Sequence, residues 1–242
     1  MTLSAALEEY MVLLLAGDRR ACRGLIEAYL DRAHSALSVY QEILWPAMER
    51  VDKLYRSDRI DTAMEHMATR INRVLADQVQ SRLRREEPCG RRVVVTCALH
   101  EPEELGAQML CDLLEARGWE VFFPGGGVPD DEILGLVGRL RPELLLIYGI
   151  RPEGVPAVRQ LVDRIREIDA APTMNIMTSG GVFNRAEGLW TEVNADLYAR
   201  SAEEALRLAQ NAAPRTPVPR SPGTPKKRRR RRRSLPLAAV GA

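Results

Sequence analysis

The sequence predicts an α/β fold in which an N-terminal four-helix bundle precedes a sheet of five parallel strands. Two observations predict it: helical periodicity fills the chain up to about residue 87, and short β-branched runs then alternate with helical patterns up to about residue 210. The composition supports a packed core, because 45% of the 242 residues are hydrophobic. Disorder throughout the chain is therefore excluded.

Residues 1–87 are expected to form the bundle. Helices are expected over residues 3–16, 20–39 and 46–55, with Pro46 in a first helical turn. In the last segment, apolar residues recur at steps of three and four, which is typical of one buried helix face. This stripe comprises Ile60, Ala63, Met64, Met67, Ile71, Val74, Leu75 and Gln78. Four antiparallel helices follow from these segments.

Residues 90–210 are expected to form a flavodoxin-like domain of five strand-helix units. Strands separated by whole helices pair in parallel, and right-handed crossovers place helices on both faces of the sheet. The expected strands are residues 92–96, 120–123, 144–150, 173–177 and 196–198. The expected helices are residues 103–117, 130–140, 155–168, 186–193 and 202–210. Ligands of such sheets bind beyond the carboxyl ends of the strands.

The last part, residues 211–242, is expected to be a disordered basic tail. It holds ten of the 35 Lys and Arg residues and no acid, which leaves 25 basic and 33 acidic residues in the body, a net charge near −8. A body of that sign repels nucleic acid, so we assign any polyanion binding to the tail. The candidate nucleic-acid residues are Lys226, Lys227, Arg228, Arg229, Arg230, Arg231, Arg232 and Arg233. The alternative is a solubilising low-complexity end.

The sequence also predicts the compartment. No stretch approaches the roughly 20 apolar residues that a membrane span needs, and the first residues lack the basic leader of a secretory signal. We therefore expect a cytoplasmic protein without a membrane segment. The four cysteines form no C-x-x-C pair and are expected to be reduced thiols.

Two sequence details resemble the cobalamin-binding module, the family of methionine synthase, corrinoid methyltransferase carriers and light-sensing cobalamin regulators. Tyr55-x9-Glu65-His66 resembles the Trp-x9-Glu-His motif of the photoreceptor regulators, whose side chains cover the upper face of the cofactor. Ser179-Gly180-Gly181 is similar to the family's Gly-Gly loop around the nucleotide tail of cobalamin. A bundle followed by a sheet domain also matches the family's order. The resemblance thus implies cobalamin as the cofactor.

Two other family features are altered. The family's Asp-x-His-x-x-Gly motif supplies the histidine that binds cobalt from below; if Gly106 is its glycine, Glu103 stands at the ligand position. A carboxylate is a poor substitute for imidazole at a cobalt corrin, and His100, in the same loop, is the alternative metal ligand. Tyr148-Gly149-Ile150 replaces the Ser-x-Leu whose hydroxyl contacts the buried nucleotide tail. Loss of cobalamin therefore stays open.

Each candidate residue also has a purely structural interpretation. Glu65 and His66 are neighbours on a helix, point about 100° apart and cannot both face the core, so they are also compatible with an ordinary helix surface. Residues 125–127 are three glycines that suit a phosphate contact or, as we favour, a strand-to-helix turn.

The sequence contains no catalytic constellation. None of its three histidines lies in a G-x-S-x-G, H-E-x-x-H or P-loop context, so we expect no enzyme. The favoured function is a cobalamin-binding sensory or regulatory protein that acts through a change at the interface of bundle and sheet. The alternatives are a corrinoid carrier for methyl transfer and a cofactor-free interaction module. A regulator or methyltransferase is the expected protein partner, and self-association stays open.

If the tail binds nucleic acid, the binding must be electrostatic. Neutralising about six to eight phosphates predicts that the logarithm of affinity for duplex DNA or RNA falls with log salt at a slope of roughly −5 to −7. Deletion of residues 226–233 should abolish this binding, measured by fluorescence anisotropy, and should leave cobalamin uptake unchanged. Tight nucleic-acid binding by a protein truncated after Gln210 would contradict the assignment to the tail.

Overall fold

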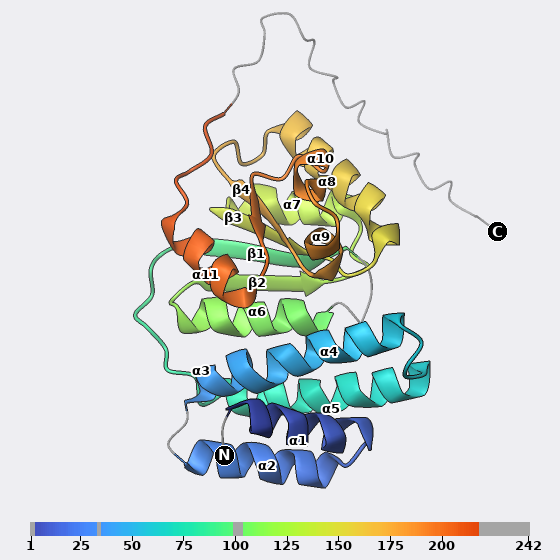
Figure 1. Cartoon of the computed structure of the whole chain (residues 1–242). Helices are drawn as coiled ribbons and strands as arrows, with labels where there is room; N and C mark the ends of the chain where they lie inside the picture. The colour runs from blue at the N-terminus through green and yellow to red at the C-terminus, as the bar shows by residue number, and fades with distance from the viewer. Residues whose placement is uncertain (1–2, 33–34, 99–103, 218–242) are drawn as a thin grey trace, which may run out of the picture.

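The fold class is confirmed by a computed structural model, which describes residues 3–32, 35–98 and 104–217. A helical bundle precedes a sheet of five parallel strands in the order β2-β1-β3-β4-β5. Figure 1 shows the molecule as a stack of layers, with α1 and α2 at one end, then α4 and α5, then α6, the sheet, and finally α7 and α8. The described residues include no helix that is long and apolar enough to cross a bilayer.

The bundle consists of four helical rods. They are α1 (Leu3–Leu15), α2 (Arg19–Asp31), the continuous run of α3 (Ala36–Val39), η1 (Tyr40–Leu44) and α4 (Trp45–Arg56), and α5 (Thr62–Gln80). Side chains cap three of the starts: Asp18, Ser35 and Asp61 each accept a hydrogen bond from a backbone N–H three residues later. These caps explain where the chain turns between rods.

The third rod differs from the prediction. The expected helix over residues 20–39 is wrong, because α2 ends at Asp31 and Ser35 caps a new helix. Pro46 lies in the first turn of α4, as predicted, but α4 continues without a break from the π turn η1. Proline has no N–H for the carbonyl four residues earlier, and the π turn, in which Trp45 N donates to Tyr40 O, carries the helix into it.

The buried face of α5 also differs from the predicted apolar stripe. Ala63, Met67 and Gln78 are exposed, whereas two polar residues, Glu65 and Asn72, are buried. Asn72 is satisfied because its amide donates to Leu44 O at 2.9 Å and its carbonyl accepts from the Tyr10 hydroxyl at 2.9 Å. Ile60, Ile71 and Leu75 of the predicted stripe are buried, so the stripe is confirmed in part, and Asn72 joins this buried face because its polar atoms are hydrogen-bonded.

The sheet domain contains the five predicted strand-helix units with shifted limits. Its strands are β1 (Arg92–Cys97), β2 (Glu120–Gly125), β3 (Leu144–Tyr148), β4 (Asn175–Ser179) and β5 (Leu197–Ala199). Its helices are α6 (Glu104–Ala116), α7 (Asp130–Leu140), η3 (Pro152–Gly154), α8 (Val155–Ile168), α9 (Gly181–Arg185), α10 (Leu189–Glu192) and α11 (Ala202–Asn211). The fourth strand starts two residues later than predicted, so Ser179 ends it.

The predicted helix over residues 186–193 is wrong. Two short helices, α9 and α10, replace it, and Gly188 lies between them at φ +78. A left-handed residue ends helical hydrogen bonding, and glycine adopts it without strain. Asn194 also has a positive φ, 59, a conformation that asparagine tolerates better than most residues.

A continuous hydrophobic core joins the bundle to the sheet. One cluster of buried side chains extends from α1 and α2 through α5 and α6 to one face of the sheet and α11. A second cluster lies under α7 and α8 on the other face. Helix α6 is therefore covered by the bundle on one side and by the sheet on the other (Figure 1).

The chain stays attached to the sheet domain beyond α11. Asn175 Nδ2 donates to Ala213 O at 2.9 Å, Arg215 N donates to Thr173 O at 2.9 Å, and Arg215 Nε lies 3.1 Å from Asp196 Oδ1. The folded body thus includes residues up to Arg215. Residues 218–242, with the basic run, lie outside the described residues.

A polar joint links the bundle to α6. The Tyr40 hydroxyl lies 2.8 Å from both Ala76 O and Asp112 Oδ2. The phenol has one proton, so at any moment the Tyr40 hydroxyl donates to Asp112 Oδ2 or to Ala76 O. Burial raises the pKa of Asp112 to about 6; the Tyr40 hydrogen bond lowers it, and Asp77 and Glu115 raise it further.

The joint predicts a pH-dependent stability. The folded state binds the Asp112 proton more tightly than the unfolded state, so this contribution is full below about pH 4 and is lost as the pH rises through about 6. Asp112→Asn, which removes the partly buried charge at any pH, should raise the free energy of unfolding at pH 8 by roughly 1–2 kcal/mol, after allowance for solvent screening.

The measurement is thermal unfolding between pH 5 and 8. The difference in melting temperature between Asp112→Asn and the wild type should grow across this range, whereas Glu27→Gln, a neutralised exposed acid on α2, should leave it unchanged. A constant difference for Asp112→Asn would contradict the raised pKa of Asp112.

Candidate functional site

The main candidate site is a cleft between the bundle and the carboxyl edge of the sheet, here called the interdomain cleft. Its volume is about 320 Å³. Helices α4 and α5 supply one wall, and the loop after β3 with α9 supplies the other. The lining residues are Met48, Val51, Asp52, Tyr55, Arg56, Glu65, Thr69, Ile150, Arg151, Pro152, Glu153 and Arg185.

The cleft has apolar residues among its walls and charged residues from both domains. Met48, Val51 and Ile150 supply aliphatic surface. Tyr55 adds a half-buried ring whose hydroxyl lies 3.4 Å from Thr62 Oγ1, at the start of α5. Three of the lining residues are acids and three are arginines. Such a surface suits a flat, largely apolar ligand that carries polar groups at its rim.

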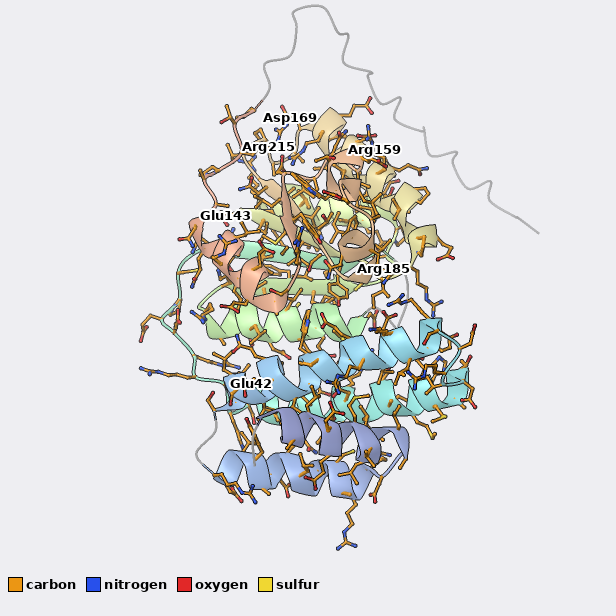
Figure 2. The ribbon with its side chains drawn as sticks, in the orientation of Figure 1. Glu42, Glu143, Arg159, Asp169, Arg185 and Arg215 are labelled. Atoms are coloured by element: carbon orange, nitrogen blue, oxygen red, sulfur yellow. The ribbon has the colours of Figure 1, made fainter. Side chains whose placement is uncertain are left out.

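An arginine bridges the two walls. Arg185 of α9 lies 3.8 Å from Asp52 Oδ2 of α4, and it also donates to Ile150 O. Figure 2 shows Arg185 between α9 and the carboxyl end of α4. Asp52 is further held by Arg56 Nε at 2.9 Å. The ion pair between Asp52 and Arg185 therefore couples the position of the bundle to the loop that follows the third strand.

Helix α5 directs Glu65 and His66 to different sides, so only part of the Tyr55, Glu65 and His66 motif lines the cleft. Tyr55 and Glu65 line the cleft, and Glu65 accepts a hydrogen bond from the Thr69 hydroxyl at 2.9 Å. His66 points away from the core with 53% of its side chain exposed, although its Nε2 lies 3.5 Å from Glu65 Oε2. The expectation that the two neighbours cannot both face the core is confirmed.

The Gly-Gly loop packs against another loop of the same chain. Gly180 has φ +102, and a Cβ there would lie 2.2 Å from Gly149 O. The two loops are therefore in direct backbone contact, which only glycine permits. Gly149 N donates to Ser179 O at 2.9 Å, and the buried Ser179 hydroxyl donates to Ala199 O at 3.0 Å.

Gly106 also has a neighbour that fills its space. A Cβ on Gly106 would lie 2.2 Å from the Tyr148 hydroxyl oxygen and 2.7 Å from Cε1 of the same ring. The space between the carboxyl end of β3 and helix α6, here called the β3–α6 slot, is thus occupied by Tyr148, which is 3% exposed. Trp45 of α4 contacts the same ring edge-on, with centroids 6.4 Å apart.

The three glycines at residues 125–127 form a turn, as favoured from the sequence. Gly125 and Gly127 have positive φ, and Gly126 N donates to Glu104 Oε1 at 3.1 Å. His100 and Glu103, the two candidates for the lower side of cobalt, lie outside the described residues. Within the described ranges, no three His, Cys, Asp or Glu side chains gather as a metal site, and all four cysteines are free.

The sequence did not reveal three residues of the site, Asp52, Arg151 and Arg185. Each is an ordinary surface charge in sequence, and only the fold brings α4 within reach of α9. Nothing in the sequence marked Trp45 as a residue of the site either. The sequence showed that Tyr148 stands where the family has the serine of Ser-x-Leu. It did not show the contact of Tyr148 with Gly106, because the two residues belong to different predicted elements.

Of the two places that a corrinoid would occupy, only the interdomain cleft has residues that suit the ligand. The interdomain cleft offers aliphatic and aromatic surface with charged groups, which suits the chemistry of a corrin ring and its polar side arms, although its volume of about 320 Å³ takes in only part of such a ligand. The β3–α6 slot does not fit a buried nucleotide tail, because the ring of Tyr148 already occupies it. The hydroxyl of Ser179 is likewise engaged with the chain.

Comparisons with known proteins agree with this architecture. Residues 6–78 match the family model described as a B12 binding domain. The fold matches a Methanosarcina barkeri monomethylamine corrinoid protein with a TM-score of 0.74 and 17% identity, over 86% of this chain and 98% of that chain. A cobalamin-binding protein from Desulfitobacterium hafniense DCB-2 matches less well, with a TM-score of 0.47 and 19% identity over 84% and 97% of the chains. A search of curated proteins found no match.

The contact between Gly106 and Tyr148 predicts a coupled pair. Gly106→Ala places a methyl group inside the tyrosine ring and should destabilise the protein by about 1–3 kcal/mol in denaturant unfolding. In a Tyr148→Ser background the same substitution should cost at least about 1 kcal/mol less, because the ring is gone.

Gly24→Ala is the matched control. Gly24 lies in α2 with nothing within 4 Å of the added Cβ, so alanine should stabilise the helix by about 0.5–1 kcal/mol. Equal costs for Gly106→Ala in the two backgrounds would show that Tyr148 does not fill the slot.

Proposed function

We propose that this chain, whose residues 6–78 match a B12 binding domain and whose fold matches a corrinoid protein, belongs to the cobalamin-binding module family, binds a corrinoid in the interdomain cleft and acts as a regulatory protein. The observation that carries the proposal is the position of the cleft. It lies at the carboxyl edge of a parallel sheet, where ligands bind, and beneath Tyr55 and Glu65 of the B12-binding bundle.

In this proposal the bundle side holds the ring. Met48, Val51 and Tyr55 provide the apolar contact, and Glu65, fixed by Thr69, presents its carboxylate at the upper side. Arg151 and Arg185 are placed to meet carbonyl groups on the ligand's side arms. A bound corrinoid supplies a cobalt centre with an exchangeable upper ligand.

The regulatory step is a change in how the bundle sits on the sheet domain. Arg185 links α9 and Ile150 to Asp52 of α4, so a ligand that competes for Arg185 or Asp52 alters a contact between the domains. A ligand shifts such an equilibrium only by its difference in affinity for the two arrangements. The bundle surface is then the signal to a protein partner, in the cytoplasm as the sequence predicts.

The second candidate is a corrinoid carrier for methyl transfer. The fold match to a monomethylamine corrinoid protein favours it, with a methyltransferase as the partner. In both candidates the chain's own residues perform no catalysis. Methyl transfer to the loaded protein from a purified corrinoid methyltransferase would favour the carrier, whereas a ligand-dependent change in bundle protection from hydrogen exchange favours the regulator.

The proposal predicts retention of a corrinoid by the full chain. Equilibrium dialysis with hydroxocobalamin should show binding at micromolar protein, and Tyr55→Ala should weaken it about tenfold, because one aromatic contact of about 1–1.5 kcal/mol is lost. Met67→Ala is the control: Met67 is exposed on α5, outside the cleft lining, and should change affinity less than about twofold. No retained corrinoid would refute the proposal.

A further inference from the structure

The ring of Tyr148 closes the β3–α6 slot and packs against both the sheet domain and the bundle. The ring of Tyr148 extends from the end of β3 toward α6, where only the missing side chain of Gly106 leaves it room. On the bundle side, Trp45 meets the ring at an interplanar angle of 83°. Tyr148 is 3% exposed and Trp45 is 8% exposed, so solvent is largely excluded from the pair.

The neighbouring loop is closed as well. Gly180 and Gly149 are in backbone contact, and a Cβ on Gly180 would also lie 2.9 Å from Gly149 N. Ser179 uses its hydroxyl on Ala199 O of the adjacent strand. Small residues at this edge of the sheet therefore serve contacts between loops, and the pocket that remains beside Tyr148, Gly180 and Gly181 has a volume of only about 40 Å³.

We propose that Tyr148 is a plug that keeps the nucleotide tail of a corrinoid out of the β3–α6 slot. This inference rests on the proposed function. The protein then selects corrinoids by the ring face alone, and cobalamin is held with its own benzimidazole base still on the cobalt. For a tail to enter, the Tyr148 ring must leave its place between Gly106 and Trp45, which removes the burial of both aromatic side chains.

The test compares two corrinoids and three proteins. Cobinamide carries the corrin ring without the nucleotide tail, whereas cobalamin carries both. Dissociation constants for each are measured by visible titration on full-length wild type, Tyr148→Phe and Tyr148→Ser. The visible spectrum also reports whether the benzimidazole base of bound cobalamin stays on cobalt. Far-ultraviolet circular dichroism confirms that each variant is folded.

The plug predicts that the wild type binds the two corrinoids within about threefold of one another, with the base on cobalt. Tyr148→Phe keeps the ring and should behave as the wild type. Tyr148→Ser opens the slot and should bind cobalamin at least tenfold more tightly than the wild type does, while cobinamide changes less than threefold. A contact that a tail gains on burial accounts for a change of this size.

Other outcomes separate the two proposals. A wild type that binds cobalamin at least tenfold better than cobinamide, with its base displaced, overturns the plug and leaves the proposed function standing. A folded Tyr148→Ser variant with no gain for cobalamin also overturns the plug. If the wild type binds neither corrinoid but Tyr148→Ser binds cobalamin, the plug stands and the proposed function fails. If no protein binds either ligand, both fail.

Discussion

Helix α6 has to be buried on two opposite sides at once, and the rest of the architecture depends on this requirement. Nine of its residues are buried, far more than one helix face supplies. The sheet covers one side, and only a second layer of helices can cover the other. The bundle is therefore a necessary part of the fold, and its position fixes where α4 and α5 meet the carboxyl edge of the sheet. The interdomain cleft exists because these two layers meet at that edge.

The layered fold was predictable because it depends on local patterns. Alternating strands and helices specify a parallel sheet, and five short β-branched runs marked its strands within a few residues. The full buried face of α5 was not predictable, because a buried Asn72 satisfied by Tyr10 and Leu44 counts as polar in any periodicity analysis. The predicted limits of the third rod were wrong for a similar reason. Nothing in the local sequence distinguishes a π turn before Pro46 from the start of a helix.

The candidate site was predictable only in part. The spacing of Tyr55 and Glu65 identified two residues that the structure brings to one cleft. The pairing of Asp52 with Arg185 joins positions more than 130 residues apart, and charge alone does not identify such a partner. Glycines were the least informative signal. Gly106 and Gly180 attracted attention as possible ligand contacts, yet each makes room for another part of the chain.

The π turn at Tyr40–Leu44 determines the direction in which the side chains of α4, the next part of the same rod, face. A π turn is an α-helix that has gained one residue, and each residue of an α-helix adds about 100° of rotation. Deleting a single residue from this turn would restore an ordinary helix and rotate α4 by that angle. Trp45, Met48 and Tyr55 would then face a different neighbour, while Tyr40 would keep its place against Ala76 and Asp112. Among homologous chains, a deletion in this segment is therefore a marker for loss of the cleft, even where every residue that lines it is retained.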